Sequence, residues 1–445
     1  MNRHATEVKR LLDGLFSSAG IRAQLARGTL RGLVVTTLGI GVGFLVQVAI
    51  ARLLGVDQFG VYSWALAWIN FLVLISCSGL EGLMGQKLPA YLIDKRYDKA
   101  RGFLLFSGYW VGGCALLCGF AMYAIAWLSQ DLILPGSLVT LAISILVVPL
   151  FALASVRQAI LRALKYVAKG QLLEAVFRPI LLALLAVGLV SWFGWAATSA
   201  TAMFAQLVAS AIVFFIGGYW VVKALPTAAR GAPPQWDGRN WLQEAMPFLA
   251  ISGASAVSAQ VGMLALGTFG TAADTGVYAA VSRIADFALM GIYSIAAIAS
   301  PLIVEVLKKH DKIGLAHVLK WGARGAFAFA MLALLGIVFL GEWILAAFGK
   351  DFRAGHGALY VLLPGVLGWA FAGMSGVLLA MSGHAKERAA IGWFSAACNL
   401  LICIVCVPQF GVYGAAWGYT LSSWFGGCLC LYYCWRYHRV WAGLR

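Results

Sequence analysis

The tripeptide Gly60-Val61-Tyr62 opens a long uncharged run and recurs 216 residues later as Gly276-Val277-Tyr278. Other identities share an offset of 216 or 217 residues: Phe71 with Phe287, Asp94-Lys95 with Asp311-Lys312, Ala163 with Ala380, Ala168-Lys169 with Ala385-Lys386, and Phe193-Gly194 with Phe410-Gly411. A chain with 51 glycines produces single matches by chance. The nearly constant offset over a whole half therefore indicates an internal repeat.

Twelve apolar runs have about the length, roughly 20 residues, that a helix needs to cross the hydrocarbon core of a bilayer. They occupy residues 32–51, 59–80, 102–128, 132–156, 175–192, 195–222, 245–273, 276–304, 325–341, 357–383, 389–408 and 411–435. The composition agrees, with 62% apolar and 11% charged residues. We therefore expect an all-α integral membrane protein with twelve transmembrane helices.

The repeat of six spans predicts how the two halves are related. An even number of spans returns the chain to its starting side, so the halves run in the same direction and are related by a pseudo-two-fold axis along the membrane normal. We expect an N-lobe at residues 32–222, a linker at 223–241 and a C-lobe at 242–435. Two parallel six-helix bundles that face each other enclose a cleft, which suits a transporter.

The net charge of +16 indicates orientation. By our count, 28 of the 33 Lys and Arg residues fall on one side of the predicted membrane. The largest groups outside the N-terminus and the second half follow the second span (Lys87, Lys95, Arg96, Lys99, Arg101) and the fourth span (Arg157, Arg162, Lys165, Lys169). Positive residues stay cytoplasmic, so we expect both termini inside. Residues 1–31 are predicted to lie as an amphipathic segment on the inner surface, and residues 436–445 form a cytoplasmic tail.

Several functional classes are excluded at this stage. No stretch is long enough to fold a basic soluble domain, so nucleic acid is not an expected partner. The nine cysteines all lie within spans, and Cys403-x-x-Cys406 has no histidine nearby, so we expect neither a metal nor a cofactor. No phosphate-binding loop is present, which argues against an ATP-hydrolysing enzyme.

The segment between the first two runs carries a family resemblance. Residues 51–62, Ala-Arg-Leu-Leu-Gly-Val-Asp-Gln-Phe-Gly-Val-Tyr, resemble the "ARxLGxxxFGxY" segment of bacterial polysaccharide flippases. Residues 276–283 are similar to the "GxYxxAxR" segment of that family, with its alanine spaced differently, and residues 411–416 to its "GxxGAA" segment. These flippases form the polysaccharide transport family of the multidrug/oligosaccharidyl-lipid/polysaccharide exporter superfamily.

The resemblance implies a cargo of polyprenyl-diphosphate-linked oligosaccharide, flipped from the cytoplasmic to the periplasmic leaflet of the bacterial inner membrane for cell-surface polysaccharide synthesis. It also implies a V-shaped central cleft lined by spans one, two, seven and eight. We expect a monomer that works with a polysaccharide polymerase and a chain-length regulator. The competing hypothesis is a cation-coupled multidrug exporter of the same superfamily.

Ionisable residues inside spans are the first candidates for function, because they are costly in a membrane. Arg283 and Asp286 stand three residues apart on one face of the eighth span. They could neutralise each other. Alternatively, Arg283 binds the diphosphate of the carrier, since a guanidinium recognises phosphate oxygens in a bidentate way. Asp286 would then orient Arg283 or exchange a proton.

Two further arginines are candidate substrate-binding residues. Arg52, at the outer end of span one, is either a headgroup anchor or a phosphate ligand at the outward mouth. Arg178 lies one turn into span five beside Pro179 and is either an interface anchor or a substrate ligand. Glu174, four residues earlier, could pair with Arg178 and is a candidate for coupling or gating.

Uncharged polar residues complete the set. Gln47, Asn70, Gln206, Gln260 and Asn399 lie within spans, where such residues usually bond between helices. Gln47, Asn70 and Gln260 fall in spans that line the cleft in the family, so they are candidates to bind sugar hydroxyls. Glu81, at the inner end of span two, either forms a gate with Lys87 or faces the headgroups.

Overall fold

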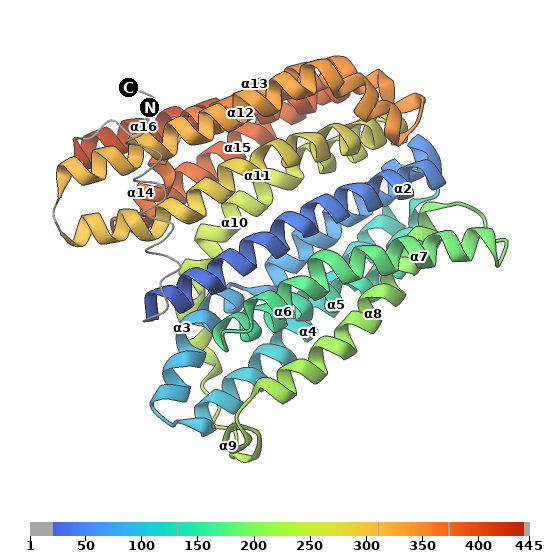
Figure 1. The fold of residues 1–445 in the computed structure, drawn as a ribbon. Coiled ribbons are helices and arrows are strands. Elements are labelled where there is room, and N and C mark those ends of the chain that lie inside the picture. Colours follow the sequence, from blue (N-terminus) through green and yellow to red (C-terminus); the bar gives the residue numbers. More distant parts are fainter. Residues whose placement is uncertain (1–20, 131–132, 310, 373, 440–445) are drawn as a thin grey trace.

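The computed structural model (Figure 1) describes residues 21–130, 133–309, 311–372 and 374–439. Across these ranges the regular secondary structure is helical, and no β-strand occurs. The predicted amphipathic pattern falls on residues 8–16, which lie outside the described ranges. From Ile21 the chain is helical and continues without a break into the first predicted span.

The first half of the chain forms, in order, α2 (Ile21–Cys77), α3 (Leu80–Ile93), α4 (Tyr97–Leu128), α5 (Ser137–Ala163), α6 (Val167–Leu172), the π-helical η2 (Leu173–Phe177), α7 (Arg178–Ser191) and α8 (Ser199–Ala224). The linker holds the short α9 (Thr227–Gly231). The second half forms α10 (Gly238–Phe269), α11 (Ala272–Lys308), α12 (Lys312–Phe348), the 3₁₀-helical η3 (Asp351–Gly355), α13 (His356–Ala372), α14 (Ser375–Met381), α15 (Ala385–Phe410) and α16 (Val412–His438). Figure 1 shows the blue-to-green helices of the first half below the yellow-to-red helices of the second.

Ten helices within the described residues are long and apolar enough to cross a membrane, so the chain is a multi-pass membrane protein. The predicted number, twelve, differs for two reasons. The prediction divides residues 37–77 into two spans, whereas the structure has a single kinked helix there. It also includes residues 411–435, and the helix at this place, α16, is not among the ten.

The kink in α2 lies at Gly55, where the backbone is non-helical (φ 76°, ψ 171°). Glycine adopts a positive φ without the steric cost that a Cβ would add. Residues on both sides stay helical, so no loop separates the first two predicted spans. Gly55 therefore joins them directly, and we call this end of the molecule the kink end.

The two recurring tripeptides meet near the kink end. A Cβ added to Gly60 would collide with the carbonyl oxygen of Ala272 and would lie 2.8 Å from the backbone nitrogen of Gly276. A Cβ added to Gly276 would collide with the carbonyl oxygen of Val56 and would lie 3.2 Å from the nitrogen of Gly60. Residues 56 and 60 correspond to 272 and 276 at the repeat offset, so this contact between α2 and α11 is reciprocal.

The opposite end carries the basic turn between α3 and α4 and the linker, and we call it the basic end. The linker is fixed to α4 there. The backbone nitrogen of Gln235 donates to the carbonyl of Asp98 (3.1 Å), and Arg101 Nη1 donates to the carbonyl of Ala232 (2.7 Å). The first helix of the second half, α10, therefore starts against the first half.

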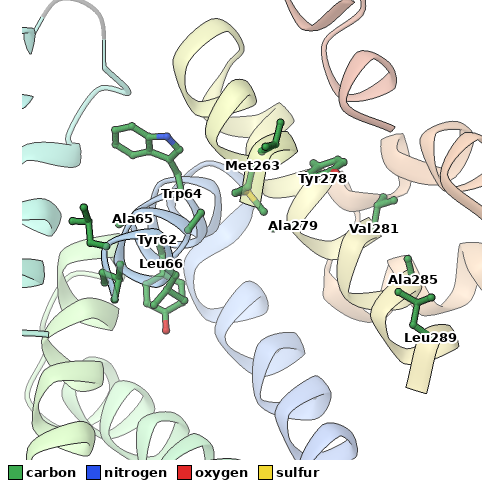
Figure 2. Packing of buried hydrophobic residues seen from close by; sticks show 14 of the residues in the cluster. Tyr62, Trp64, Ala65, Leu66, Met263, Tyr278, Ala279, Val281, Ala285 and Leu289 are labelled. Atoms are coloured by element: carbon green, nitrogen blue, oxygen red, sulfur yellow. The ribbon is translucent and has the colours of Figure 1, made fainter. Parts of the chain in front are cut away.

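The core between the halves is built from large side chains of α2 and from large and small side chains of α10 and α11. Figure 2 shows Tyr62 and Trp64 leaving α2 in different directions, with Met263 beyond Trp64 and the α11 residues Ala279 and Ala285 further along. Trp64 is buried and packs on α10 where Gly267 has no side chain to obstruct it. The kinked helix α2 therefore packs against both halves of the chain.

Candidate functional site

One face of α11 is accessible along the middle of the helix, although the adjoining faces are buried. The accessible face carries Arg283, Asp286, Phe287, Met290, Tyr293 and Ser294, which recur with the period of a helix (i, i+3, i+4, i+7, i+10, i+11). Arg283 Nη1 lies 3.7 Å from Asp286 Oδ2, and the two side chains are 42% and 61% exposed. The pair is therefore loose, and both charges remain open to a further partner.

This face is turned toward the first half of the chain. The ring of Phe287 contacts the ring of Phe44 on α2, with centroids 6.1 Å apart. The Arg283–Asp286 pair therefore faces the region between the halves rather than the lipid.

The structure separates the five uncharged polar residues into two classes. Gln206 accepts a hydrogen bond from the Tyr62 hydroxyl (3.1 Å), and Asn399 donates to the carbonyl of Ser258 (3.2 Å). Both are buried, so these two bond between helices. Gln47, Asn70 and Gln260 make no hydrogen bond within the described residues. Their amides are available to a cargo, and their role as sugar ligands stays a prediction.

Gln47 and Gln260 lie on faces that meet the other half. Gln47 is one turn from Phe44, which contacts both Phe287 and Phe348 of the second half. Gln260 lies two turns before Gly267, on the same face of α10, and Gly267 packs against Trp64 of α2. Asn70 is exposed on α2.

Arg52 joins the halves at the kink end. Its Nε donates to the carbonyl of Ala347 at the end of α12, where helix carbonyls lack partners and a cation is favourable. Phe59 of α2 packs beside it on Phe348 and Phe352, with centroids 6.5 and 5.8 Å away. Neither sequence interpretation of Arg52 included this contact, and binding of a phosphate by Arg52 stays a prediction.

A second group of charges lies inside the first half. Arg157 of α5 forms an ion pair with Glu174, and its Nη1 also donates to the carbonyls of Val213 (3.0 Å) and Phe214 (3.2 Å) on α8. Gly217 leaves the space that the Arg157 guanidinium occupies. Both Arg157 and Glu174 are buried.

Glu174 also pairs with Arg178, as the i, i+4 spacing predicted. Arg178 Nε lies 3.1 Å from Glu174 Oε2, and the guanidinium covers the ring of Phe151 at 4.3 Å. The Arg178 side chain is 24% exposed, so it is the outermost member of this cluster. Each carboxylate oxygen of Glu174 contacts a guanidinium, so Glu174 stabilises two cations, and its role in coupling or gating stays a prediction. Substrate binding by Arg178 stays a prediction.

The local backbone explains the position of Glu174. Pro179 has no N–H to bond the carbonyl of Ala175, and the preceding turn, η2, widens into a π-helix that contains Glu174. Such π-bulges often mark functional sites. Ala175 is pressed against Gly39 of α2, where a Cβ would collide. The bulge therefore points Glu174 at Arg157 while α2 supports the other side.

In this structure Lys87 pairs with Glu244 rather than with Glu81, and a gating role for Glu81 stays a prediction. Lys87 Nζ lies 2.6 Å from Glu244 Oε2 at the start of α10, and the hydrogen bond that Lys87 donates to Glu244 raises the pKa of Lys87. Glu81 is half-buried on α3. Residues 81 and 87 are six apart on a helix, which places them on different faces.

Sequence reasoning missed Arg157 and Glu244. Arg157 was assigned to a loop because it ends an uncharged run, but α5 continues through it to Ala163. Its partner Glu174 lies on another helix, so no spacing along a single helix predicts the pair. Among the described residues, no three His, Cys, Asp or Glu side chains gather as metal ligands would, and all nine cysteines are free thiols.

Comparison with known proteins gives both a family and a fold. The family described as polysaccharide biosynthesis protein matches residues 25–307. No curated protein sequence matches the chain at a significant level. Among solved structures, the inward-facing conformation of a multidrug resistance MATE family transporter of the MOP superfamily matches with a TM-score of 0.76 and 13% identity, over 92% of this chain and 98% of that one.

Two further structures share the fold. The outward-facing conformation of a multidrug resistance MATE family transporter gives a TM-score of 0.61 at 13% identity, over 93% of this chain and 95% of that one. The lipid II flippase MurJ in an inward closed conformation gives 0.68 at 15% identity, over 90% and 86%.

Proposed function

The chain belongs to the family of polysaccharide biosynthesis proteins, and on that premise we propose that it flips a polyprenyl-diphosphate-linked oligosaccharide across the bacterial inner membrane. The cargo would pass from the cytoplasmic to the periplasmic leaflet by alternating access, for the synthesis of O-antigen, capsule or exopolysaccharide. The solved structures with this fold reported above are transporters and a flippase, which supports the proposal that the chain is a transporter and not an enzyme.

The proposed architecture is two parallel six-helix bundles with a V-shaped cleft that opens at the basic end. The reciprocal contact of Gly60 with Gly276 supports a pseudo-two-fold axis between the bundles. Contacts of Phe59 with Phe348 and of Arg52 with Ala347 support closure at the kink end. The higher TM-score to an inward-facing transporter than to an outward-facing one, 0.76 against 0.61, agrees with this state.

The basic end faces the cytoplasm in this proposal. Positive residues are retained on that side of bacterial membranes. The turn between α3 and α4 carries Lys95 and Arg96 beside the linker, and Lys99 follows in the first turn of α4. Both termini would then be cytoplasmic. A polysaccharide polymerase and a chain-length regulator would receive the cargo on the other side.

The observation that carries the proposal is the exposed Arg283–Asp286 pair. A guanidinium at 3.7 Å from its only acidic neighbour on the helix retains N–H groups for a bidentate contact with phosphate oxygens. Because the pair faces the region between the halves, a diphosphate in the cleft would meet Arg283. Gln47, Asn70 and Gln260 would bind the sugar hydroxyls.

A cation-coupled multidrug exporter is the second candidate. The accessible carboxylate of Asp286 favours it, because a cationic drug or a coupling ion needs an acidic partner. The accessible guanidinium of Arg283 weighs against it, because a cation that faces the region between the halves suits an anionic cargo.

The test is deletion of the gene in the bacterium that carries it, with complementation by the wild type, by Arg283→Gln and by Lys309→Gln. Lys309 is the matched control, since it pairs with Glu305 at the end of the same helix (2.7 Å). We expect lipid-linked repeat units to accumulate inside the deletion strain and in the Arg283→Gln strain but not in the control. Normal surface polysaccharide with raised dye sensitivity would establish the exporter instead.

A further inference from the structure

A separate polar cavity of about 320 Å³ lies at the basic end, between the first half and the start of α10. Lys87 of α3, Arg96 of the following turn and Lys99 of α4 line it from the first half. Asp237 and Glu244 line it from the α10 side. The cavity therefore has cations on one wall and carboxylates on the other.

The charges of this cavity are not all satisfied internally. Lys87 and Glu244 pair at 2.6 Å. Arg96 and Lys99 form no ion pair within the described residues. Asp237 accepts one hydrogen bond through Oδ1, from Asn240 (2.6 Å). Arg96, Lys99 and the second oxygen of the Asp237 carboxylate therefore remain for a ligand that carries both a negative and a positive charge.

The walls are held in place without a ligand. Trp241 is buried, and its Nε1 donates to the hydroxyl of Tyr91 at 3.1 Å. Its ring contacts Phe103 and Phe106, with centroids 5.1 and 5.5 Å away. A cavity of fixed shape binds with less loss of conformational entropy than one that must be ordered first.

Neighbouring aromatic residues place the cavity at the level of lipid headgroups. Trp236, next to Asp237, stacks on Tyr109 of α4 with centroids 6.4 Å apart, and both rings are largely exposed. Exposed Trp and Tyr side chains of membrane proteins gather at the boundary between hydrocarbon and water. A ligand could therefore reach the cavity from the adjacent leaflet.

We propose that this cavity binds the phosphoethanolamine headgroup of a membrane lipid. The phosphate would contact Arg96 and Lys99, and the ammonium would contact Asp237. The volume suits one headgroup and is too small for an oligosaccharide, since it lies at the lower limit of small-molecule sites, about 300–1,000 Å³. The bound headgroup would tie α10 to the first half, whatever the cargo of the cleft.

The experiment is native mass spectrometry of the full-length protein in detergent, with phosphatidylethanolamine, phosphatidylglycerol or phosphatidylcholine added. We expect the wild type to bind phosphatidylethanolamine roughly tenfold more tightly than phosphatidylcholine, whose trimethylammonium group has no N–H to donate. The variant Arg96→Gln/Lys99→Gln should lose about tenfold or more in affinity for phosphatidylethanolamine. The variant Asp237→Asn should reduce the preference for phosphatidylethanolamine over phosphatidylglycerol.

The matched control is Lys95→Gln/Arg239→Gln, which removes the same charge from exposed neighbours that do not line the cavity. An equal loss of affinity in this control would show general attraction to a basic surface and overturn the proposal. Equal binding of the three lipids by the wild type would also overturn it, and this comparison needs no variant to fold. A polyprenyl diphosphate that displaces phosphatidylethanolamine from the cavity would reassign the site to the cargo.

Discussion

Two groups of arginine and carboxylate side chains lie on the helices of this membrane protein. The first half holds Arg157, Glu174 and Arg178, and the second half holds Arg283 and Asp286. In the first group, Arg157 and Glu174 are buried, and the partners come from α5, η2, α7 and α8. In the second, both residues lie on α11, 3.7 Å apart, with side chains 42% and 61% exposed.

The difference indicates which charges hold the helices together and which meet the cargo. A buried ion must have its partners, because an uncompensated charge in a low-dielectric interior is very costly. Glu174 has a guanidinium on each side and so fixes three helical segments to one another. The Arg283–Asp286 pair fixes nothing beyond its own helix, and its accessible charges face the other half. We therefore assign the first cluster to stability and the second to transport.

The largest expected effect is that of Glu174→Gln. The substitution keeps the shape but leaves two guanidinium groups without their counter-ion, which costs about 3–5 kcal/mol of folding stability. Thermal unfolding of the purified protein in detergent measures this, with Asp286→Asn as the matched acidic control. Equal unfolding temperatures for the two variants would erase the distinction between the clusters.

Arg157→Gln and Arg178→Gln divide the buried cluster further. Arg157 has three acceptors and is buried, so its loss should cost about 3 kcal/mol. Arg178 is 24% exposed and has one ionic contact, so its loss should cost about 1 kcal/mol. The same unfolding assay compares them. A larger loss for Arg178, or a transport defect in Arg178→Gln without a loss of stability, would move Arg178 to the transport group.

Arg283→Gln should leave folding unchanged and reduce transport. Loss of charge-assisted contacts with a diphosphate lowers the rate by at least about tenfold. The accumulation of lipid-linked repeat units in the complemented deletion strain measures the rate. Arg283→Lys should restore part of it, because lysine keeps the charge but lacks the bidentate geometry. An unfolding temperature as low as that of Glu174→Gln would instead make Arg283 structural.

Asp286→Asn is expected to have the smallest effect. If Asp286 only orients Arg283, removing its charge changes flipping of the anionic cargo by no more than about threefold. Transport of labelled lipid-linked oligosaccharide into proteoliposomes, with and without a proton gradient, measures it. Complete loss of gradient-driven transport would assign Asp286 to ion coupling and favour the exporter.

The membrane-spanning helices were predictable because the bilayer itself sets the length of an apolar run. Their ends were not. The run before Arg157 stops at a charge, but α5 continues because Glu174 and two carbonyls of α8 satisfy that charge within the protein. Similarly, α2 passes through the charged segment around Arg52 because Gly55 turns the backbone without interrupting the helix on either side.

The site was predictable where it depends on spacing along one helix. The pairs Glu174–Arg178 and Arg283–Asp286 follow from separations of four and three residues, and the structure contains both. Spacing could not separate Gln206 from Gln47, because each is a single polar residue in an apolar run. Only the packing shows that Gln206 faces Tyr62 while Gln47 has no partner among the described residues.

At the Gly60–Gly276 crossing, a tripeptide meets its own copy in a reciprocal contact, as equivalent surfaces do in a homodimer. In a homodimer of a six-helix precursor, one glycine codon would have supplied both sides of this contact, because both subunits come from the same gene. In this chain the two glycines are encoded separately and mutate separately. Both glycines must be kept for the two backbones to stay in contact, so one close contact constrains two codons.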